Sequence, residues 1–324
     1  IRVLAAQALP SMKRFILLDR LPTNFITLVN FLICFHSKPK NSTGMQFNKN
    51  YLITFLLFAS FCKGFSQDST CITITWDSLS PGIFFSDVDA PNKSILNDSK
   101  LSIVKIDPNK VEFSILSASE HGNKSRTAPE WANEFGMSVI INAGMYDLDK
   151  TLSNKGFMQN FNHLNNPTLY PSYGGMIAFN PADTTINNFQ ILDLEHTPWD
   201  SVKTCYYSYS QGMRMIDCNG SPLTWNKKNQ LCSMLLCAID KEGFVYYIFS
   251  RSPYTHNEMI RFLLAMPFEI TGAIYLEGGP EASMYINTPN KKIEKYGSYV
   301  SRSYENDKND HFWKIPNVIG VKTK

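Results

Sequence analysis

Several patterns that define large enzyme classes are missing from this 324-residue sequence. It has six histidines but no His-x-His or His-Glu-x-x-His pattern, no P-loop and no Gly-x-Ser-x-Gly turn. Its seven cysteines include no Cys-x-x-Cys pair of the kind that binds structural zinc. Metalloproteases, nucleotide hydrolases and serine hydrolases therefore have no motif to support them.

The sequence also has no uninterrupted apolar segment long enough to cross a membrane. Its clearest apolar run, Tyr51–Phe61, has eleven residues, whereas a helix needs about 20 to cross a bilayer. Met45 and a cationic segment precede this run, and small residues follow it up to Ser66, which together predict a secretory signal peptide over residues 45–66. Phe61 before Cys62 argues against lipoprotein cleavage. Residues 1–44 begin without Met and are interpreted as a mis-called upstream extension.

Without this leader the chain loses its positive charge. Residues 1–66 hold eight Lys/Arg and one Asp, so the net charge changes from +3 to −4 (23 basic against 27 acidic residues). Nucleic-acid binding therefore has no compositional support. Residues 67–324 are long enough for one domain with a well-buried core, and we expect it to be secreted or periplasmic with no membrane span.

Runs typical of strands dominate this domain. They are rich in β-branched and aromatic residues and are separated by turn sequences. The expected strands are Cys71–Trp76, Leu101–Asp107, Val111–Ser117, Met137–Asn142, Gly174–Phe179, Met213–Asp217, Ser233–Asp240, Phe244–Ser250 and Ala273–Leu276. Residues 287–312 are polar and predict a long surface loop or a lid.

Two helices are expected among these strands. Each begins with a Thr-x-x-Glu capping box, at Thr127 and at Thr255. The predicted class is α+β, with a mixed β-sheet core, a few packed helices and a single domain. Five cysteines remain in this domain, and the odd count leaves at least one thiol free. Cys232 and Cys237 are expected to be buried free thiols that face opposite sides of one strand.

The most informative stretch is the sequence from Tyr275 to Tyr285. An apolar strand runs directly into Glu277, and Gly278 and Gly279 follow, so a rigid element delivers a carboxylate beside a turn without side chains. A second carboxylate and Ser283 come shortly after. The alternative is an ordinary Gly-Pro turn with two solvated glutamates.

A second strand end has the same construction: Ile140-Ile141 leads into Asn142-Ala-Gly144. Further along come Ser210-Gln-Gly-Met-Arg214, Ser250-Arg251-Ser and the tail Ile315-Pro-Asn-Val-Ile319. In this order the segments resemble the motifs of the phosphodiester glycosidases, enzymes that release a sugar from a phosphodiester, over roughly residues 72–321. The resemblance implies a hydrolase whose substrate is a carbohydrate or a sugar phosphodiester and which needs no cofactor.

Three departures from the family motifs mark a divergent branch. Glu277 replaces the family's aspartate, Ala282 replaces a serine, and Gly212-Met213-Arg214 stands in place of a Gly-Pro motif. The natural substrate is therefore not fixed by the resemblance.

The chemistry of a sugar 1-phosphodiester selects the candidate residues. Its leaving group is already a stabilised phosphate anion, so proton donation matters less and cations that hold the phosphate matter more. The candidates for catalysis are Glu277, Asp147 and His256, and those for substrate binding are Arg214, Arg251, Asn142, Gly144, Gly278, Gly279 and Ser283.

Each candidate also has a structural interpretation. Arg251 and Arg214 are compatible with ion pairs or an outward strand position, Asp147 with a turn, and His256 with a helix start. Asn142 either orients a sugar or ties down its loop. The glycines shape the backbone. Asp147 and Asp149 do not have the spacing of an EF-hand, so a bound metal stays undetermined.

Two functions therefore remain open. One is a glycosidase acting on a sugar-1-phosphodiester. The other is a carbohydrate- or envelope-binding module that kept the fold and lost the chemistry, because the extra methylene of Glu277 displaces its carboxylate by about 1 Å.

Overall fold

The computed structural model describes residues 73–147, 152–226 and 229–324. The described residues belong to one compact unit. The upstream extension and signal peptide expected within residues 1–66 lie outside the described residues, as does Asp149. No helix in the described ranges is long and apolar enough to cross a membrane.

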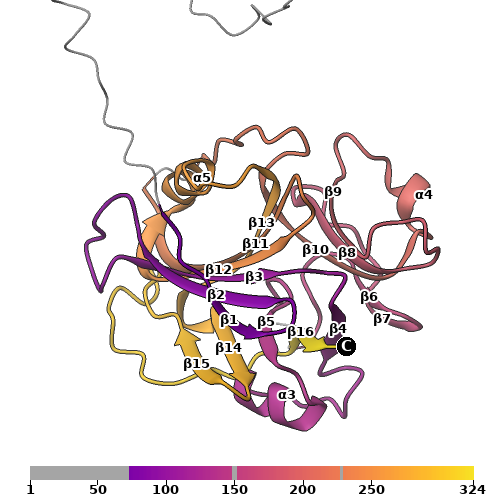
Figure 1. The fold of residues 1–324 in the computed structure, drawn as a ribbon, viewed down its shortest axis with the longest axis horizontal. Helices are drawn as coiled ribbons and strands as arrows, with labels where there is room; N and C mark the ends of the chain where they lie inside the picture. Colours follow the sequence, from indigo (N-terminus) through magenta and orange to yellow (C-terminus); the bar gives the residue numbers. More distant parts are fainter. Residues whose placement is uncertain (1–72, 148–151, 227–228) are drawn as a thin grey trace, which may run out of the picture. The chain divides into compact units, whose positions relative to one another are not determined.

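The described unit contains an eleven-stranded sheet, whose main path runs β1-β2-β3-β12-β11-β13-β10-β6-β7 (Figure 1). β8 pairs with β10 and carries β9. The strands are β1 (Asp77–Ser80), β2 (Ile83–Asp89), β3 (Lys100–Ile106), β6 (Met158–Asn160), β7 (His163–Asn166), β8 (Gly174–Pro181), β9 (Phe189–Asp193), β10 (Tyr206–Ile216), β11 (Leu231–Asp240), β12 (Val245–Thr255) and β13 (Ile270–Gly278).

A second, five-stranded sheet has the order β15-β14-β5-β16-β4. Its strands are β4 (Val111–Ser117), β5 (Val139–Asn142), β14 (Ser283–Thr288), β15 (Lys291–Tyr296) and β16 (Asn317–Thr323). Every pairing between named strands in the described ranges is antiparallel, where the sequence had suggested a mixture of parallel and antiparallel pairs. The α+β class is confirmed, with strands predominating.

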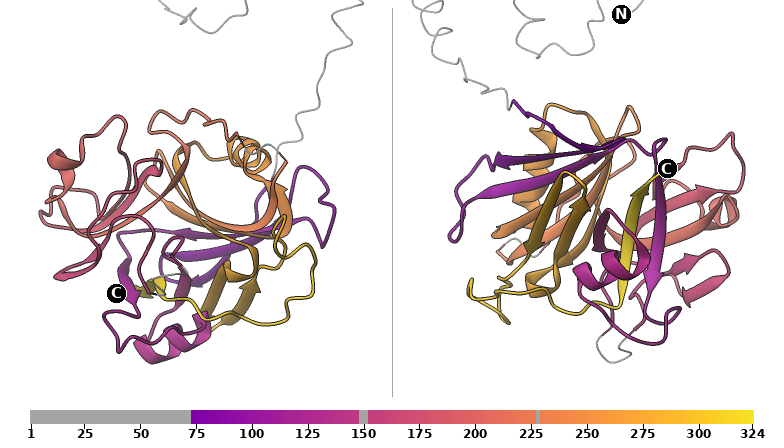
Figure 2. Two further views of the ribbon diagram at one scale, coloured as in Figure 1. Left: turned by 180° about the vertical axis from the view of Figure 1, so that it is seen from behind. Right: turned by 60° about the horizontal axis from the view of Figure 1, so that its bottom comes forward.

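The elements stack in four layers. The two sheets enclose one hydrophobic core, to which Leu235 of the large sheet and Ile141 of the small sheet both contribute. Helix α5 (His256–Leu264) covers the other face of the large sheet through Met259 and Leu263. Helix α3 (Ala128–Phe135) covers the outer face of the small sheet with Trp131, and Figure 2 shows it in front of that sheet. A third, one-turn helix is α4 (Trp199–Val202).

The central strand β11 is apolar on both sides because each of its faces lies against a core. Cys237 faces the core between the sheets, and Cys232 faces the core under α5. Both are buried free thiols, so this prediction is confirmed. A strand buried on both faces has a continuous apolar sequence instead of an alternating one.

Both predicted capping boxes are present. The Thr127 and Thr255 hydroxyls accept a hydrogen bond from the backbone N–H of Glu130 and Glu258, and each glutamate accepts one from the threonine N–H. Two of the four N–H groups that a helix start leaves unpaired are satisfied in this way.

The polar segment 287–312 is only partly a loop. Its first part completes the β14–β15 hairpin, so the expectation of a loop over the whole segment is wrong. Lys291, Lys292 and Glu294 are exposed while Ile293 is buried. Such an edge strand, protected by lysines, resembles a loop in its composition.

The first strand is also shifted from its expected place. Residues 73–76 form no strand, and β1 begins at Asp77. β10 starts seven residues before the expected strand at Met213, and its first half buries the polar residues Ser208, Ser210 and Gln211.

Candidate functional site

Glu277 lies near the end of β13, where the strand pairing is irregular. Leu235 pairs with Glu277 and Leu236 with Tyr275, so Leu276 has no opposite residue. Such a bulge redirects the side chains that follow it. At this bulge the side chain of Glu277 departs from the regular alternation of side chains between the two faces of the sheet.

The two glycines after Glu277 are required by their surroundings. A Cβ on Gly278 would overlap the Tyr275 hydroxyl, and Gly279 has a φ of +67° with Val300 3.0 Å from the position of a Cβ. They lead into the one-turn 3₁₀ helix η3 (Gly279–Glu281), which places Glu281 beside Glu277. Here the glycines shape the backbone, as the sequence predicted.

Asn142, at the end of β5, connects the turn that contains Glu281 to the small sheet. Its Nδ2 donates to the Glu281 carbonyl at 3.0 Å, and its Oδ1 accepts from the Ser283 N–H at 2.7 Å. The Ser283 hydroxyl donates to the Glu281 carbonyl at 2.9 Å. Because both side chains hold the backbone of this turn, they act as positioning groups for Glu281.

Glu277 and Glu281 form a carboxyl pair with unusual acidity. Burial raises the pKa of Glu277 well above its ordinary range, and the charge of Glu281 raises it further. The Gly278 N–H, 2.9 Å from Glu277 Oε1, and the Lys155 ammonium lower this pKa in part. Burial also raises the pKa of Glu281. Two such carboxyl groups favour a state in which one holds a proton.

Two tyrosines and a lysine complete the surroundings of this pair. The pKa of Tyr146 is raised by burial and by the charges of Glu281 and Glu277, and that of Tyr173 by burial, Tyr170 and Glu277. Lys155 is exposed, and its ammonium lies over the ring of Tyr170 at 5.8 Å. The pair therefore has phenol groups and one cation within electrostatic reach.

Gln211 of β10 holds the loop that carries Lys155. Its Oε1 accepts from the N–H groups of Phe157 and Tyr170, and its Nε2 donates to the Tyr170 carbonyl. Gly144 packs against the Asn154 side chain, whose Oδ1 would lie 2.7 Å from a Cβ at that position. Gly144 thus allows a close approach of this loop to β5.

Arg214 is committed to two carboxylates. Its side chain is buried and donates to Asp193 and Glu195. Its guanidinium group is therefore paired at the end of β9, and a substrate phosphate would have to compete with both carboxylates for it.

Arg251 holds the segment after β15. Its guanidinium donates to the Asp307 carboxylate at 2.7 Å and to the backbone carbonyls of Tyr296, Asp307 and Asn309. The same segment brings Val300 against Gly279. Arg251 therefore stabilises the turn at Gly278 and Gly279 indirectly, because it anchors the segment that carries Val300.

The remaining catalytic candidates lie in different surroundings. Asp147 follows β5, and its backbone N–H donates to the Ser153 carbonyl at 3.2 Å. His256 is buried at the start of α5, where its ring stacks on Trp225 with 3.9 Å between centroids and meets Tyr275 edge-on. His256 thus contacts the opposite face of β13 from the inter-sheet core.

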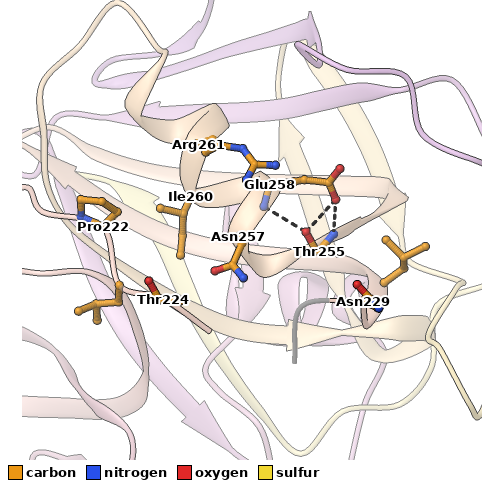
Figure 3. Close-up of a pocket in the computed structure, with 10 residues that line it drawn as sticks. Pro222, Thr224, Asn229, Thr255, Asn257, Glu258, Ile260 and Arg261 are labelled. Carbon is orange, nitrogen blue, oxygen red and sulfur yellow. Dashed lines mark hydrogen bonds between the residues drawn. The ribbon is translucent and has the colours of Figure 1, made fainter. Parts of the chain in front are cut away.

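A cavity of about 740 Å³ opens beside α5 (Figure 3). Thr255, Asn257 and Arg261 line it on the helix side, and Thr224 and Asn229 line it on the other. Neither Glu277 nor Glu281 is among its lining residues, and Glu258 is already used in the helix cap. Its size alone does not outweigh the chemistry at the end of β13.

Sequence reasoning left four members of this arrangement out of the predicted site. Glu281 was visible in the motif after Glu277, and its spacing across a Gly-Gly-Pro turn was the available signal. Tyr146, Lys155 and Tyr173 reach the carboxyl pair only through the fold of residues 143–175. Tyrosine and lysine in a loop give no pattern that would single them out.

Comparison with known proteins places this arrangement in context. The chain resembles a hypothetical protein from Synechocystis, with a TM-score of 0.53, 11% identity and 78% of this chain covered, and it spans 64% of that structure's length. It also resembles the catalytic domain of zebrafish N-acetylglucosamine-1-phosphodiester alpha-N-acetylglucosaminidase, with a TM-score of 0.52, 14% identity, and 78% of this chain and 88% of that chain covered. These similarities concern the fold. No curated protein matches the sequence.

The model of one protein family, described as phosphodiester glycosidase, matches residues 135–322, which is more than half of the 324 residues. The match includes both strand ends and the Glu277–Glu281 pair. It confirms the resemblance drawn from the motifs, and the chain belongs to the phosphodiester glycosidase family.

Proposed function

We propose that this protein hydrolyses the glycosidic bond of a sugar-1-phosphodiester, with Glu277 and Glu281 as its two reacting carboxyl groups. The observation that carries the proposal is the raised pKa of both groups at a strand end within the family match. Glycoside hydrolysis uses a carboxyl pair of which one member is protonated and the other ionised.

The electrostatics suggest how the roles divide. The pKa of Glu277 is raised by both burial and Glu281, so Glu277 is the member assigned the proton. A neutral Glu277 donates to the departing phosphate oxygen, and it repels an anionic substrate less than a carboxylate would. Glu281, in its ionised form, stabilises the developing positive charge on the sugar or activates water.

Lys155 is the cation best placed for the phosphate. Its charge acts on Glu277, and its ammonium is exposed beside Tyr170. The guanidinium groups of Arg214 and Arg251 are held by carboxylates and carbonyls, so the proposal assigns them positioning roles. A single ammonium supplies a point charge that tolerates different phosphate orientations.

The direct test uses a sugar 1-phosphate esterified with 4-methylumbelliferol. Cleavage of the glycosidic bond gives umbelliferyl phosphate, which becomes fluorescent only after a phosphatase is added, whereas cleavage of the aryl ester gives fluorescence at once. The assay is repeated with several sugars and with both anomers. We expect a phosphatase-dependent signal from the wild type, and we expect the rate of turnover to fall at least about a thousandfold in Glu277→Gln.

Glu112→Gln is the matched control, because Glu112 is an exposed glutamate of β4. It should retain wild-type turnover. Absence of turnover with every sugar tested, together with measurable sugar binding, would favour the binding-module interpretation. Turnover unchanged in Glu277→Gln would remove the catalytic assignment and make Asp147 the next candidate.

A further inference from the structure

A second group of reactive side chains lies away from the carboxyl pair. Asp193, His196 and Cys218 bring a carboxylate oxygen, an imidazole nitrogen and a thiol sulfur within 4.8 Å of one another. Asp193 ends β9, His196 follows in the next turn, and Cys218 lies in the turn after β10. The three residues thus join two segments that are adjacent only in the folded chain.

The distances are close to those of a tetrahedral metal site. With bonds of about 2.0 Å to oxygen and nitrogen and about 2.3 Å to sulfur, the ligand atoms around zinc lie roughly 3.3–3.6 Å apart. His196 Nδ1 is 3.0 Å from Asp193 Oδ2, so these two atoms need to separate only slightly. The sulfur lies within 4.8 Å of both atoms, and a side-chain rotation of the exposed Cys218 can bring it to bonding distance.

The carboxylate of this group is held in a fixed orientation. Asp193 is 3% exposed, and its Oδ1 accepts from Arg214 and from the Glu195 N–H. Its Oδ2 is left directed at the His196 ring and at the Cys218 backbone N–H. A ligand oriented by other hydrogen bonds in this way is typical of metal sites.

The charges around the group suit a divalent cation. Asp193, Glu195 and a deprotonated Cys218 carry three negative charges, and Arg214 contributes one positive charge. The Asp217 carboxylate directly before Cys218 accepts from the N–H groups of Asn219 and Ser221 and adds a fourth negative charge. The surroundings are therefore net negative, and a divalent ion offsets most of this charge.

We propose that Asp193 Oδ2, His196 Nδ1 and Cys218 Sγ bind a zinc ion, with water as the fourth ligand. The thiolate and imidazole select zinc over calcium and magnesium, which prefer oxygen ligands. The thiol releases its proton when it binds the metal, and the neutral imidazole binds through Nδ1 in the tautomer that carries its proton on Nε2, so no oxidation is involved. Bound zinc would join the turn after β9 to the turn after β10 and so fix the acidic partners of Arg214.

The test uses the untagged full-length protein, reduced and stripped of metal with a chelator, and titrated with Co²⁺ alone. Coordination by Cys218 gives a thiolate-to-cobalt charge-transfer band that Zn²⁺ then abolishes. We expect the charge-transfer band that corresponds to one bound Co²⁺ per chain to be missing in Cys218→Ser. In His196→Ala we expect the affinity for Co²⁺ to fall at least about a hundredfold. Cys205→Ser, which alters a thiol just before β10, should leave the signal unchanged.

A second measurement uses only the wild type and does not depend on how the variants fold. Zn²⁺ should slow alkylation of Cys218 at least about tenfold while the rate at Cys205 stays the same, as followed by mass spectrometry of the peptides. A Co²⁺ signal that is equal in wild type and Cys218→Ser, or alkylation of Cys218 that ignores Zn²⁺, would overturn the proposal. Neither readout involves sugar hydrolysis, so the proposed function stands or falls separately.

Discussion

The negative charge of Glu281 raises the pKa of Glu277, although a turn of three residues separates them along the chain. The turn folds back as a 3₁₀ helix, and Asn142 fixes it by two hydrogen bonds. The pKa of Glu277 is therefore raised first by its burial and then by the charge of Glu281, whose turn Asn142 of β5 holds in place.

This raised pKa of Glu277 predicts how the stability of the protein depends on pH. Above the ordinary pKa the unfolded chain releases a proton that folded Glu277 still holds, so the free energy of unfolding falls as pH rises through this interval. Glu277→Gln removes that loss. We expect the variant to become more stable relative to the wild type as the pH rises above the ordinary pKa of a glutamate, by about 1.4 kcal/mol for each unit of pKa difference.

Urea unfolding at a series of pH values measures this effect. Glu112→Gln, at an exposed position, serves as the control and should run parallel to the wild type. Parallel curves for Glu277→Gln as well would show that Glu277 titrates normally in the folded protein.

Lys155→Ala tests the proposed phosphate contact. We expect kcat/KM for a sugar phosphodiester to fall about tenfold or more, because one charge-assisted hydrogen bond is lost. An aryl glycoside has no phosphate, so its hydrolysis should change little. Steady-state kinetics on the two substrates give the comparison, with Lys203→Ala, at the exposed C-cap of α4, as a control. An equal loss on both substrates would exclude a phosphate-specific role.

Arg251→Ala should act on stability and local order. The substitution removes the anchor of Tyr296, Asp307 and Asn309, and we expect a loss of about 2 kcal/mol together with faster hydrogen exchange over residues 297–309. Arg261→Ala, on the exposed side of α5, is the matched control. Unchanged exchange in residues 297–309, accompanied by a higher KM for the phosphodiester, would instead support direct substrate binding by Arg251.

Gly278→Ala should reveal the close contact beneath the carboxyl pair. The new methyl group meets the Tyr275 hydroxyl, and such overpacking costs about 1–3 kcal/mol. Tyr275→Phe in the same chain removes the obstructing oxygen, so the double variant should recover part of the loss. Thermal unfolding of the four proteins in this cycle gives the coupling, and strictly additive effects would contradict the contact.

Much of the fold was predictable because its local rules agree with its final packing. The two helices begin at Thr127 and Thr255, where the sequence places a capping box, and Val111–Ser117 matches its strand from end to end. β10 was predicted too short, and its missing first half contains the polar residues Ser208 and Gln211. Their hydrogen-bond partners, Asn160 of β6 and Tyr170 of the loop before β8, lie far away in the sequence, where a local pattern does not reach.

The candidate site divides in the same way. Glu277 and the glycines beside it were found because a strand, a carboxylate and a turn are consecutive in the sequence. Glu281 needed the geometry of the turn, and Lys155 needed the path of a loop held by Gln211. The ion pairs of Arg214 with Asp193 and Glu195 also join separate elements, so composition alone gave no reason to prefer them over a substrate phosphate.

The neighbours of β5 have a consequence for how the protein folds during synthesis. β5 pairs only with β14 and β16 in the described part of the small sheet, and these strands follow it by more than 140 residues. Such distant pairings slow folding, and the ribosome releases β5 long before its partners exist. The apolar β5 edge is then a transient target for chaperones, and the carboxyl pair that Asn142 organises is assembled among the last parts of the molecule.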